Sequence, residues 1–263
     1  MRIKTTLSLL ATVVALLACG DSTGPGGSII EDEWDGQMDA GDVLEIRGVN
    51  GGIIASAAVG SEAVVSFTLQ GHDDDPATVS VVVFEHIGGV TICAVYPDVP
   101  GQPTNVCAPG SEYRMSVQDN DVQVTFTVSV PAGVTFVGRT INGSVLGNAL
   151  ESNAFVSTVN GGLDVSTTQM ADATTVNGSI TAEIGMADWD RDLPFTVVNG
   201  NVEVTVPAAT NAEARLVTVN GSVTSDFTLT EFGPGDWRGT LGSGGRALTL
   251  TTVNGNVTLR SGS

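Results

Sequence analysis

The stretch that decides the fold is Thr158-Val159-Asn160-Gly161-Gly162-Leu163-Asp164-Val165, in which an Asn-Gly pair separates two short β-type runs. The Asn-Gly pair occurs seven times in a similar frame, beginning at Asn50, Asn142, Asn160, Asn177, Asn199, Asn220 and Asn254. From Asn142 onward the spacings are 18, 17, 22, 21 and 34 residues. Internal repetition of this kind is typical of stacked repeat architectures.

The residues that flank Asn-Gly argue against a two-residue hairpin, which is the usual interpretation of this dipeptide between strands. In such a hairpin Val159 would face Gly162, and an apolar residue would face a small or polar one at all seven places. If the chain bends without reversing, Val159, Gly161, Leu163 and Val165 share one apolar face. Thr158 and Asn160 then point outward.

These patterns predict an all-β fold, a β-solenoid (single-stranded β-helix) in which coils of about 20 residues bury their apolar faces against one another. The alternative is an antiparallel β-sandwich or meander. Stacked coils would align their outward side chains in columns. The predicted asparagine ladder contains Asn142, Asn160, Asn177, Asn199, Asn220 and Asn254. A threonine column would contain Thr140, Thr158, Thr175, Thr218 and Thr252, and a third column Ser144, Ser179, Asn201, Ser222 and Asn256.

The N-terminus has the pattern of an export signal. A short basic segment, Met1-Arg2-Ile3-Lys4, precedes an apolar run that is too short to span a bilayer and ends Leu16-Leu17-Ala18-Cys19. This ending resembles the bacterial lipobox, so we expect a signal peptide over 1–18, lipidation of Cys19, a flexible tether up to residue 39 and a β-helix domain over 40–263. The alternative is an ordinary secretory signal with a chance cysteine. A lipid-anchored protein of the cell envelope follows, with the outer membrane favoured over the inner because Gly20, not Asp, follows Cys19.

Composition excludes several classes of function. The formal net charge is −19, and it becomes about −21 without residues 1–18, which disfavours nucleic-acid binding. Lys4 is the only lysine, so the rest of the chain has no Walker A or Schiff-base lysine. Two histidines cannot form a three-histidine metal site. We therefore expect no cofactor and no metal centre.

Cys93 and Cys107 are predicted to form a disulfide, since they are the pair that remains in an oxidising compartment once Cys19 is lipidated. Several prolines lie within or just after the loop between them, as a surface excursion requires. A catalytic thiol is the alternative, but no histidine is nearby in the sequence.

Two further groups of residues are candidates for binding. His72 and the run Asp73-Asp74-Asp75 form a cluster whose carboxylate oxygens suit a cation, but the spacing matches no calcium loop and a solvated turn before a strand is the preferred interpretation. Trp189 and Trp237 lie beside acidic residues in the longest intervals of the repeat and are candidate ligand contacts, with packing against the solenoid as the alternative. The acidic residues do not recur in register with the repeat and no Gly-x-Ser-x-Gly motif is present, so we predict no catalytic residues.

Two segments resemble the β-strand-repeat "putative adhesin" family of bacteria, a domain of unknown function. One runs from Val128-Ser129-Val130-Pro131-Ala132-Gly133-Val134 into Thr140-Ile141-Asn142-Gly143, and the other from Val204-Thr205-Val206-Pro207-Ala208 into Thr218-Val219-Asn220-Gly221. The resemblance implies a right-handed β-helix exported to the cell envelope, without catalytic residues. It favours a non-catalytic structural or adhesin-like interaction module, with the membrane as one partner and a glycan or a surface protein as another. The alternative is a polysaccharide-binding or polysaccharide-active β-helix.

Overall fold

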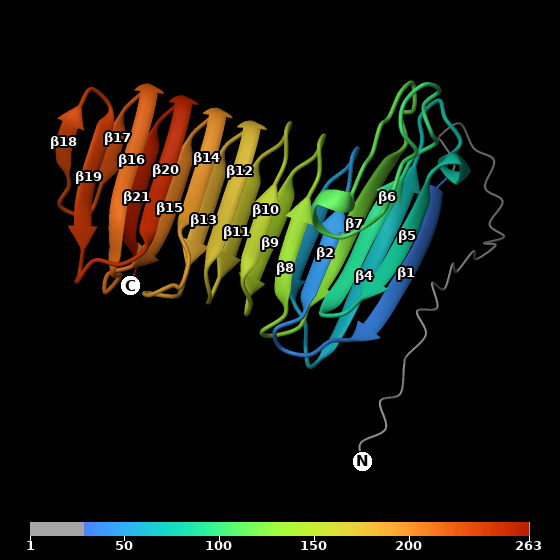
Figure 1. Cartoon of the computed structure of the whole chain (residues 1–263), viewed down its shortest axis with the longest axis horizontal. Coiled ribbons are helices and arrows are strands. Elements are labelled where there is room, and N and C mark those ends of the chain that lie inside the picture. Colours follow the sequence, from blue (N-terminus) through green and yellow to red (C-terminus); the bar gives the residue numbers. More distant parts are fainter. Residues whose placement is uncertain (1–28, 263) are drawn as a thin grey trace, which may run out of the picture.

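The computed structural model describes residues 29–262, which form two large β-sheets that face each other along an elongated molecule (Figure 1). The predicted signal peptide 1–18 and the predicted lipidation site Cys19 lie outside the described residues. Within residues 29–262 no helix has the length and apolar character needed to cross a bilayer. Two short 3-10 helices occur, η1 (Pro76–Thr78) and η2 (Gly110–Glu112).

The ten-stranded sheet contains, in spatial order, β1 (Ile29–Gln37), β4 (Glu62–Gln70), β7 (Gln123–Val130), β3 (Ile53–Ala57), β9 (Val145–Leu150), β11 (Leu163–Thr167), β13 (Ile180–Ile184), β15 (Val202–Pro207), β21 (Val257–Gly262) and β17 (Val223–Ser225). The eleven-stranded sheet contains, in spatial order, β18 (Thr230–Gly233), β19 (Asp236–Leu241), β16 (Ala212–Asn220), β20 (Ala247–Asn254), β14 (Leu193–Asn199), β12 (Ala171–Asn177), β10 (Ala154–Ser157), β8 (Thr135–Arg139), β2 (Val43–Arg47), β6 (Gly89–Val95) and β5 (Ser80–His86).

The strands between β7 and β17 in one sheet, and between β16 and β6 in the other, are all parallel to their neighbours. A coil is one strand of the eleven-stranded sheet followed, through a corner, by one strand of the ten-stranded sheet. Parallel pairing of successive coils is the arrangement of a solenoid and excludes the antiparallel meander for this part of the chain. The right-handedness of the coil stays a prediction.

The coils do not stack in the order of the sequence. Their spatial order is β6–β7, β2–β3, β8–β9, β10–β11, β12–β13, β14–β15, β20–β21 and β16–β17. The last coil of the chain, β20–β21, therefore lies between two earlier ones, and Figure 1 shows the C-terminus among the strands of that end. The spacing of 34 residues between Asn220 and Asn254 results from the hairpin β18–β19 and the return of the chain to this inner position.

The core lies between the sheets and consists of the alternate residues of each strand. In the ten-stranded sheet, for example, Leu163 lies opposite Ile180, Ile180 opposite Val202 and Val202 opposite Val257, and all four are buried. Each coil contributes only a few such side chains, so their burial depends on the neighbouring coils.

Antiparallel strands cover both ends of the stack. At the N-terminal end β4 pairs with β7, β1 pairs with β4, and β5 pairs with β6. At the other end β19 pairs with β16 and β18 pairs with β19. The expected tether over 19–39 is wrong for Ile29–Gln37, which forms β1 with nine residues in register with β4. Its inward residues Ile30 and Trp34 pack against the core, which explains why this polar segment is ordered.

Candidate functional site

The corners that contain Asn-Gly bring seven asparagine side chains into one hydrogen-bonded ladder. Along the stack the Nδ2 of each asparagine donates to the Oδ1 of the next one, at 2.8–2.9 Å, in the order Asn220, Asn254, Asn199, Asn177, Asn160, Asn142 and Asn50. The sequence-predicted ladder is therefore present, and Asn50 extends it by one member. The chain order of the last two members is reversed, because the coil β20–β21 lies inside the coil β16–β17.

The ladder leaves hydrogen-bonding capacity unused at every rung. A primary amide has two N–H donors and two acceptor lone pairs. An interior member such as Asn177 uses one N–H toward Asn160 and one lone pair toward Asn199. One donor and one acceptor per rung thus remain for solvent or a ligand, repeated at the spacing of parallel strands, about 4.8 Å.

At six of the seven corners the residue before the asparagine is exposed and forms an aliphatic row, which overturns one prediction; at the seventh corner Val49 is buried. Val159 was expected inside and Thr158 outside, but Val159 is 39% exposed and Thr158 only 5%. The same holds along the stack, where Ile141, Val176, Val198, Val219 and Val253 are exposed and Thr140, Thr175, Thr218 and Thr252 are buried. The corner turns over five residues, so the inward positions 154, 156 and 158 before it are followed by 163 and 165 after it.

The buried threonines have a structural role, because each hydroxyl donates to a glycine carbonyl of the adjacent coil. Thr158 donates to Gly143, Thr175 to Gly161 and Thr252 to Gly200, at 2.8–3.0 Å. Thr140 and Thr218 make the same bond to Gly51 and Gly255. Val197 occupies this position in the coil β14–β15 and cannot donate. A signal for this arrangement was present in the sequence: Ala171, Ala173 and Thr175 continue one alternating apolar series.

The third predicted column is present on the outside. Its side chains accept from the backbone N–H of the next coil, as Ser144 does from Gly162, Ser179 from Asn201 and Asn201 from Asn256. Ser222 donates from its N–H to Asn256. Two coils carry glycine at this position, Gly52 and Gly162, and there the column is interrupted.

We call the combined surface the ladder face: the asparagine ladder, the aliphatic row and the third column. None of the seven corners, residues 48–52, 140–144, 158–162, 175–179, 197–201, 218–222 and 252–256, contains a charged residue. The whole chain has 29 acidic residues, so the uncharged ladder face stands apart from the rest of the molecule.

The first coil of the stack lacks an Asn-Gly corner, because residues 96–122 form an excursion between β6 and β7. The predicted disulfide between Cys93 and Cys107 is present, with the two Cα atoms 5.7 Å apart. Arg47 on β2 donates to the Gly110 carbonyl at 2.8 Å and lies over the Tyr113 ring, 4.5 Å from its centroid. The excursion therefore covers the coil β2–β3.

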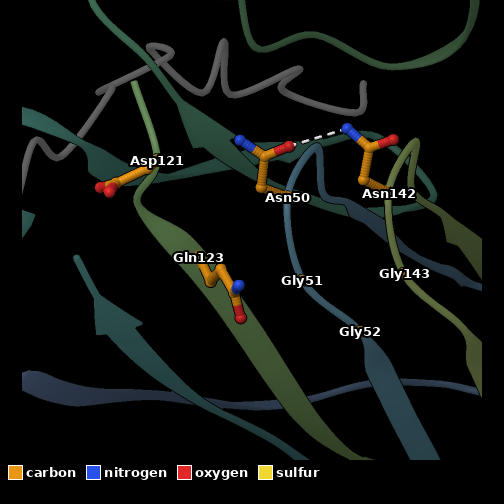
Figure 2. A pocket seen from close by; sticks show the side chains of 7 residues that line it. All are labelled: Asn50, Gly51, Gly52, Asp121, Gln123, Asn142 and Gly143. Carbon is orange, nitrogen blue, oxygen red and sulfur yellow. Dashed lines mark hydrogen bonds between the residues drawn. The ribbon is translucent and has the colours of Figure 1, made fainter. Parts of the chain in front are cut away.

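A hollow of about 450 Å³ lies where the excursion meets the end of the ladder. It is lined by Asn50, Gly51, Gly52, Asp121, Gln123, Asn142 and Gly143. Figure 2 shows Asn50 and Asn142 joined by their hydrogen bond, with Gln123 on the neighbouring strand below them. The hollow is not predictable from the sequence, because Asp121 and Gln123 belong to no repeat motif and lie about 70 residues from Asn50 in the chain.

Asp121 is locked in place by the turn that contains the acidic cluster. Its carboxylate accepts from the backbone N–H groups of Asp73, Asp74 and His72, at 2.8–3.2 Å, and its own N–H donates to Asp74. The N–H group of Asp73 makes the largest contribution to lowering the pKa of Asp121, with smaller ones from Asp74 and His72. His72 and Asp73 point into solvent, so the solvated-turn interpretation fits this segment.

The two candidate tryptophans do not present their rings as an open platform. Trp189 is only 9% exposed and packs in the core, which makes the predicted ligand contact wrong for this residue. The 22-residue interval around it supplies a loop long enough to fold the ring inward. Trp237 lies on β19 opposite Leu216 and is half-buried against the core.

Comparison with known families gives one match, and it covers the regular part of the stack. Residues 140–260 match the family model described as Toastrack DUF4097. This toastrack segment contains six of the seven Asn-Gly corners, and the terminal coil with the excursion precedes it. No curated protein matches the chain by sequence.

A solved structure shares the fold over most of the chain. A protein from Clostridium sporogenes, described as "a putative cell adhesion protein", is 8% identical with a TM-score of 0.52, and the match covers 89% of this chain and all of that one. "A putative adhesin" from Bacteroides fragilis is 10% identical with a TM-score of 0.33, covering 89% of this chain and 98% of that one. The first similarity shows that this chain shares the fold of that protein over the toastrack segment and the coils that precede it.

Proposed function

We propose that this protein is a non-catalytic interaction module of the cell envelope, anchored through a lipid on Cys19, whose ladder face binds an uncharged glycan. The observation that carries the proposal is the seven-member asparagine ladder, with an unused amide donor and acceptor at each rung.

The chemistry of the ladder face suits a polymer of neutral sugars. Sugar hydroxyls take up amide donors and acceptors, and the aliphatic row beside them can cover the less polar faces of the rings. Since the ladder face has no charge while the chain as a whole is strongly acidic, a neutral polymer can approach it without desolvating a carboxylate. Many weak, regularly spaced contacts favour avidity over single-site affinity.

Binding is favoured over hydrolysis by the state of the carboxylate that lines the hollow at the end of the ladder. A glycoside hydrolase needs one carboxyl group that stays protonated as a general acid. Asp121 is the carboxylate that lines the hollow, and its pKa is lowered by the backbone N–H groups that it accepts, so it stays ionised. Asp172 is a carboxylate whose pKa is raised by burial, as a general acid requires. However, it lies opposite Phe155 on the neighbouring strand and forms an ion pair with Arg191 at 3.3 Å.

Glycan-array screening of the chain from residue 20 onward tests the binding proposal. Val176→Glu together with Val198→Glu would place two charges on the ladder face, and Thr181→Glu, exposed on the outer face of β13, is the matched control. We expect the ladder variant to lose binding to neutral glycans and the control to retain it. Equal binding by both, or release of reducing sugar from any polysaccharide, would contradict the proposal.

The anchor is tested separately, because it depends on the sequence around Cys19. Metabolic labelling with a fatty acid should mark the full-length protein, and Cys19→Ser should abolish the label and release the protein from membranes. Fractionation should place the labelled protein in the outer membrane. An unlabelled wild-type protein would exclude the lipid anchor.

A further inference from the structure

We propose that the hollow at the N-terminal end of the ladder is a binding site for one unit of a neutral polyhydroxylated ligand, a sugar ring of a glycan chain. The inference rests on the proposed function, since it names the place on the ladder face where an individual sugar is held. The remaining rungs then contact the units that follow.

The hollow exists because the repeat stops there. Every inner corner has another Asn-Gly corner stacked on each side, but beyond Asn50 the neighbouring chain is the end of the excursion, which places Asp121 and Gln123 at this position. The backbone of Gly51 lies directly against β7, since a Cβ on Gly51 would clash with the Val124 carbonyl oxygen. The hollow therefore lies between the last Asn-Gly corner of the ladder and the chain that leads into β7.

The walls of the hollow carry hydrogen-bonding groups without partners in the described part of the chain. The Gln123 amide and the Gly52 N–H make no hydrogen bond to residues 29–262, and neither does the N–H of Ser144, the residue that follows the lining residue Gly143. Where the third column has a serine or asparagine, its side chain accepts such an N–H, whereas Gly52, like Gly162, has no side chain to do so. The Asn50 Nδ2 lies 3.4 Å from the Asn120 carbonyl oxygen, at the long end of the hydrogen-bond range.

Two of the lining side chains, Asn50 and Asp121, are held in place before any ligand arrives. Asn50 is fixed by the bond from Asn142, and Asp121 by three backbone N–H groups. The disulfide between Cys93 and Cys107 restrains the excursion 96–122, which contains Asp121. Preorganised polar groups lower the entropic cost of binding.

The lining defines the class of ligand. It contains amides, one carboxylate and glycine backbone, with no cationic and no apolar side chain. An anionic sugar would meet the Asp121 carboxylate without a counter-charge, and an apolar molecule would leave the polar walls unsatisfied. Hydroxyl groups act as both donors and acceptors, and a volume of about 450 Å³ lies within the range of small-molecule sites.

Two pairs of variants of the chain from residue 20 onward test the site. Gly52→Ser adds the missing side chain of the third column and gives the Ser144 N–H an acceptor; the backbone of Gly52 is not left-handed, and its Cβ would lie 3.2 Å from the Ser144 carbonyl oxygen. Gly162→Ser makes the same change outside the hollow, where the nearest atom is 3.6 Å away. Gln123→Ala removes the free amide, and Gln70→Ala, on the neighbouring strand β4, is its control.

Calorimetry with neutral tetrasaccharides of glucose, mannose and N-acetylglucosamine provides the readout, together with their sulfated counterparts. We expect at least one neutral probe to bind, and Gly52→Ser and Gln123→Ala to weaken it about tenfold or more while both controls bind as wild type. If the probe binds but Gly52→Ser and Gln123→Ala leave affinity unchanged, the hollow is not the site, although the ladder face remains the binding surface. If no neutral probe binds, or only sulfated ones do, this inference and the proposed function both fail. Circular dichroism of all four variants checks that they are folded.

Discussion

Asn220 and Asn254 are 34 residues apart in the sequence, yet the Nδ2 of Asn220 lies 2.8 Å from the Oδ1 of Asn254. It is Asn254 that continues the ladder to Asn199, with its Nδ2 2.8 Å from that residue's Oδ1. The final coil of the chain therefore joins the coil β16–β17 to the rest of the stack. The stability of this end therefore depends on β20 and β21.

Removal of residues 246–263 should detach the segment 212–241. Without β20 and β21, the strands β16 and β17 lose their parallel partners, and β14 and β15 become open edges. We expect hydrogen exchange to show loss of protection over 212–241 and retention of protection over 135–184. Truncation after Arg260 keeps most of these pairs and serves as the control. Retained protection in 212–241 would mean that β16 can pair directly with β14.

Asn177→Ala should destabilise the fold by about 1 kcal/mol, because the side chain takes part in two hydrogen bonds. The net contribution of one such bond to stability is about 0.5–1.5 kcal/mol, and we expect the lower end at an exposed site. Asn220→Ala, at the end of the ladder, removes only one bond and should cost less. Urea unfolding of the two variants measures the difference. Equal stability of both variants and the wild type would show that water replaces the ladder bonds without loss.

Thr175→Val should cost about 1 kcal/mol, since the buried hydroxyl donates to the Gly161 carbonyl at 3.0 Å and the replacement leaves that acceptor without its partner. The converse substitution, Val197→Thr, provides a donor in the coil where the threonine is missing and should be neutral or stabilising. Denaturation midpoints compare the two. A strongly destabilising Val197→Thr would show that the hydroxyl cannot reach the Gly178 carbonyl.

Asp121 should make the fold sensitive to acid. Its pKa in the folded protein is lowered, first by the Asp73 N–H and then by those of Asp74 and His72, relative to about 3.9 for an unfolded aspartate. A lowered folded pKa contributes stability that is present above the unfolded pKa and is lost as the pH falls through the folded pKa. Asp121→Asn should therefore lower the melting temperature near pH 7, and the difference from wild type should shrink as the pH falls below about 4.

Asp73→Asn is the matched control for this experiment, because the Asp73 carboxylate is exposed and lies 4.0 Å from the His72 ring. Its melting temperature should follow the wild type across the same pH range. A constant difference between Asp121→Asn and the wild type at every pH would show that the carboxylate charge is not involved.

The sequence by itself determined the repeat, the parallel coils, the asparagine ladder and the disulfide. Each of these follows from local pattern: Asn-Gly recurs in one frame, the apolar alternation continues through the bend, and Cys93 and Cys107 are close together in the chain. Because identical corners stack on one another, the side chains of Asn142, Asn160 and Asn177 lie close enough to form hydrogen bonds.

Only the tertiary structure decided which side of the corner faces inward, the order of the coils and the position of the hollow. Thr158 and Val159 exchange their expected sides because a five-residue corner shifts the alternation by one, and that shift depends on how the corner closes against Gly143. The insertion of β20–β21 and the meeting of Asp121 with Asn50 depend on pairing between segments that are far apart in the chain. The local sequence pattern indicates which face of a strand is apolar. Which strands become neighbours depends on the completed stack, because each coil buries its core against the coils or strands on both sides of it.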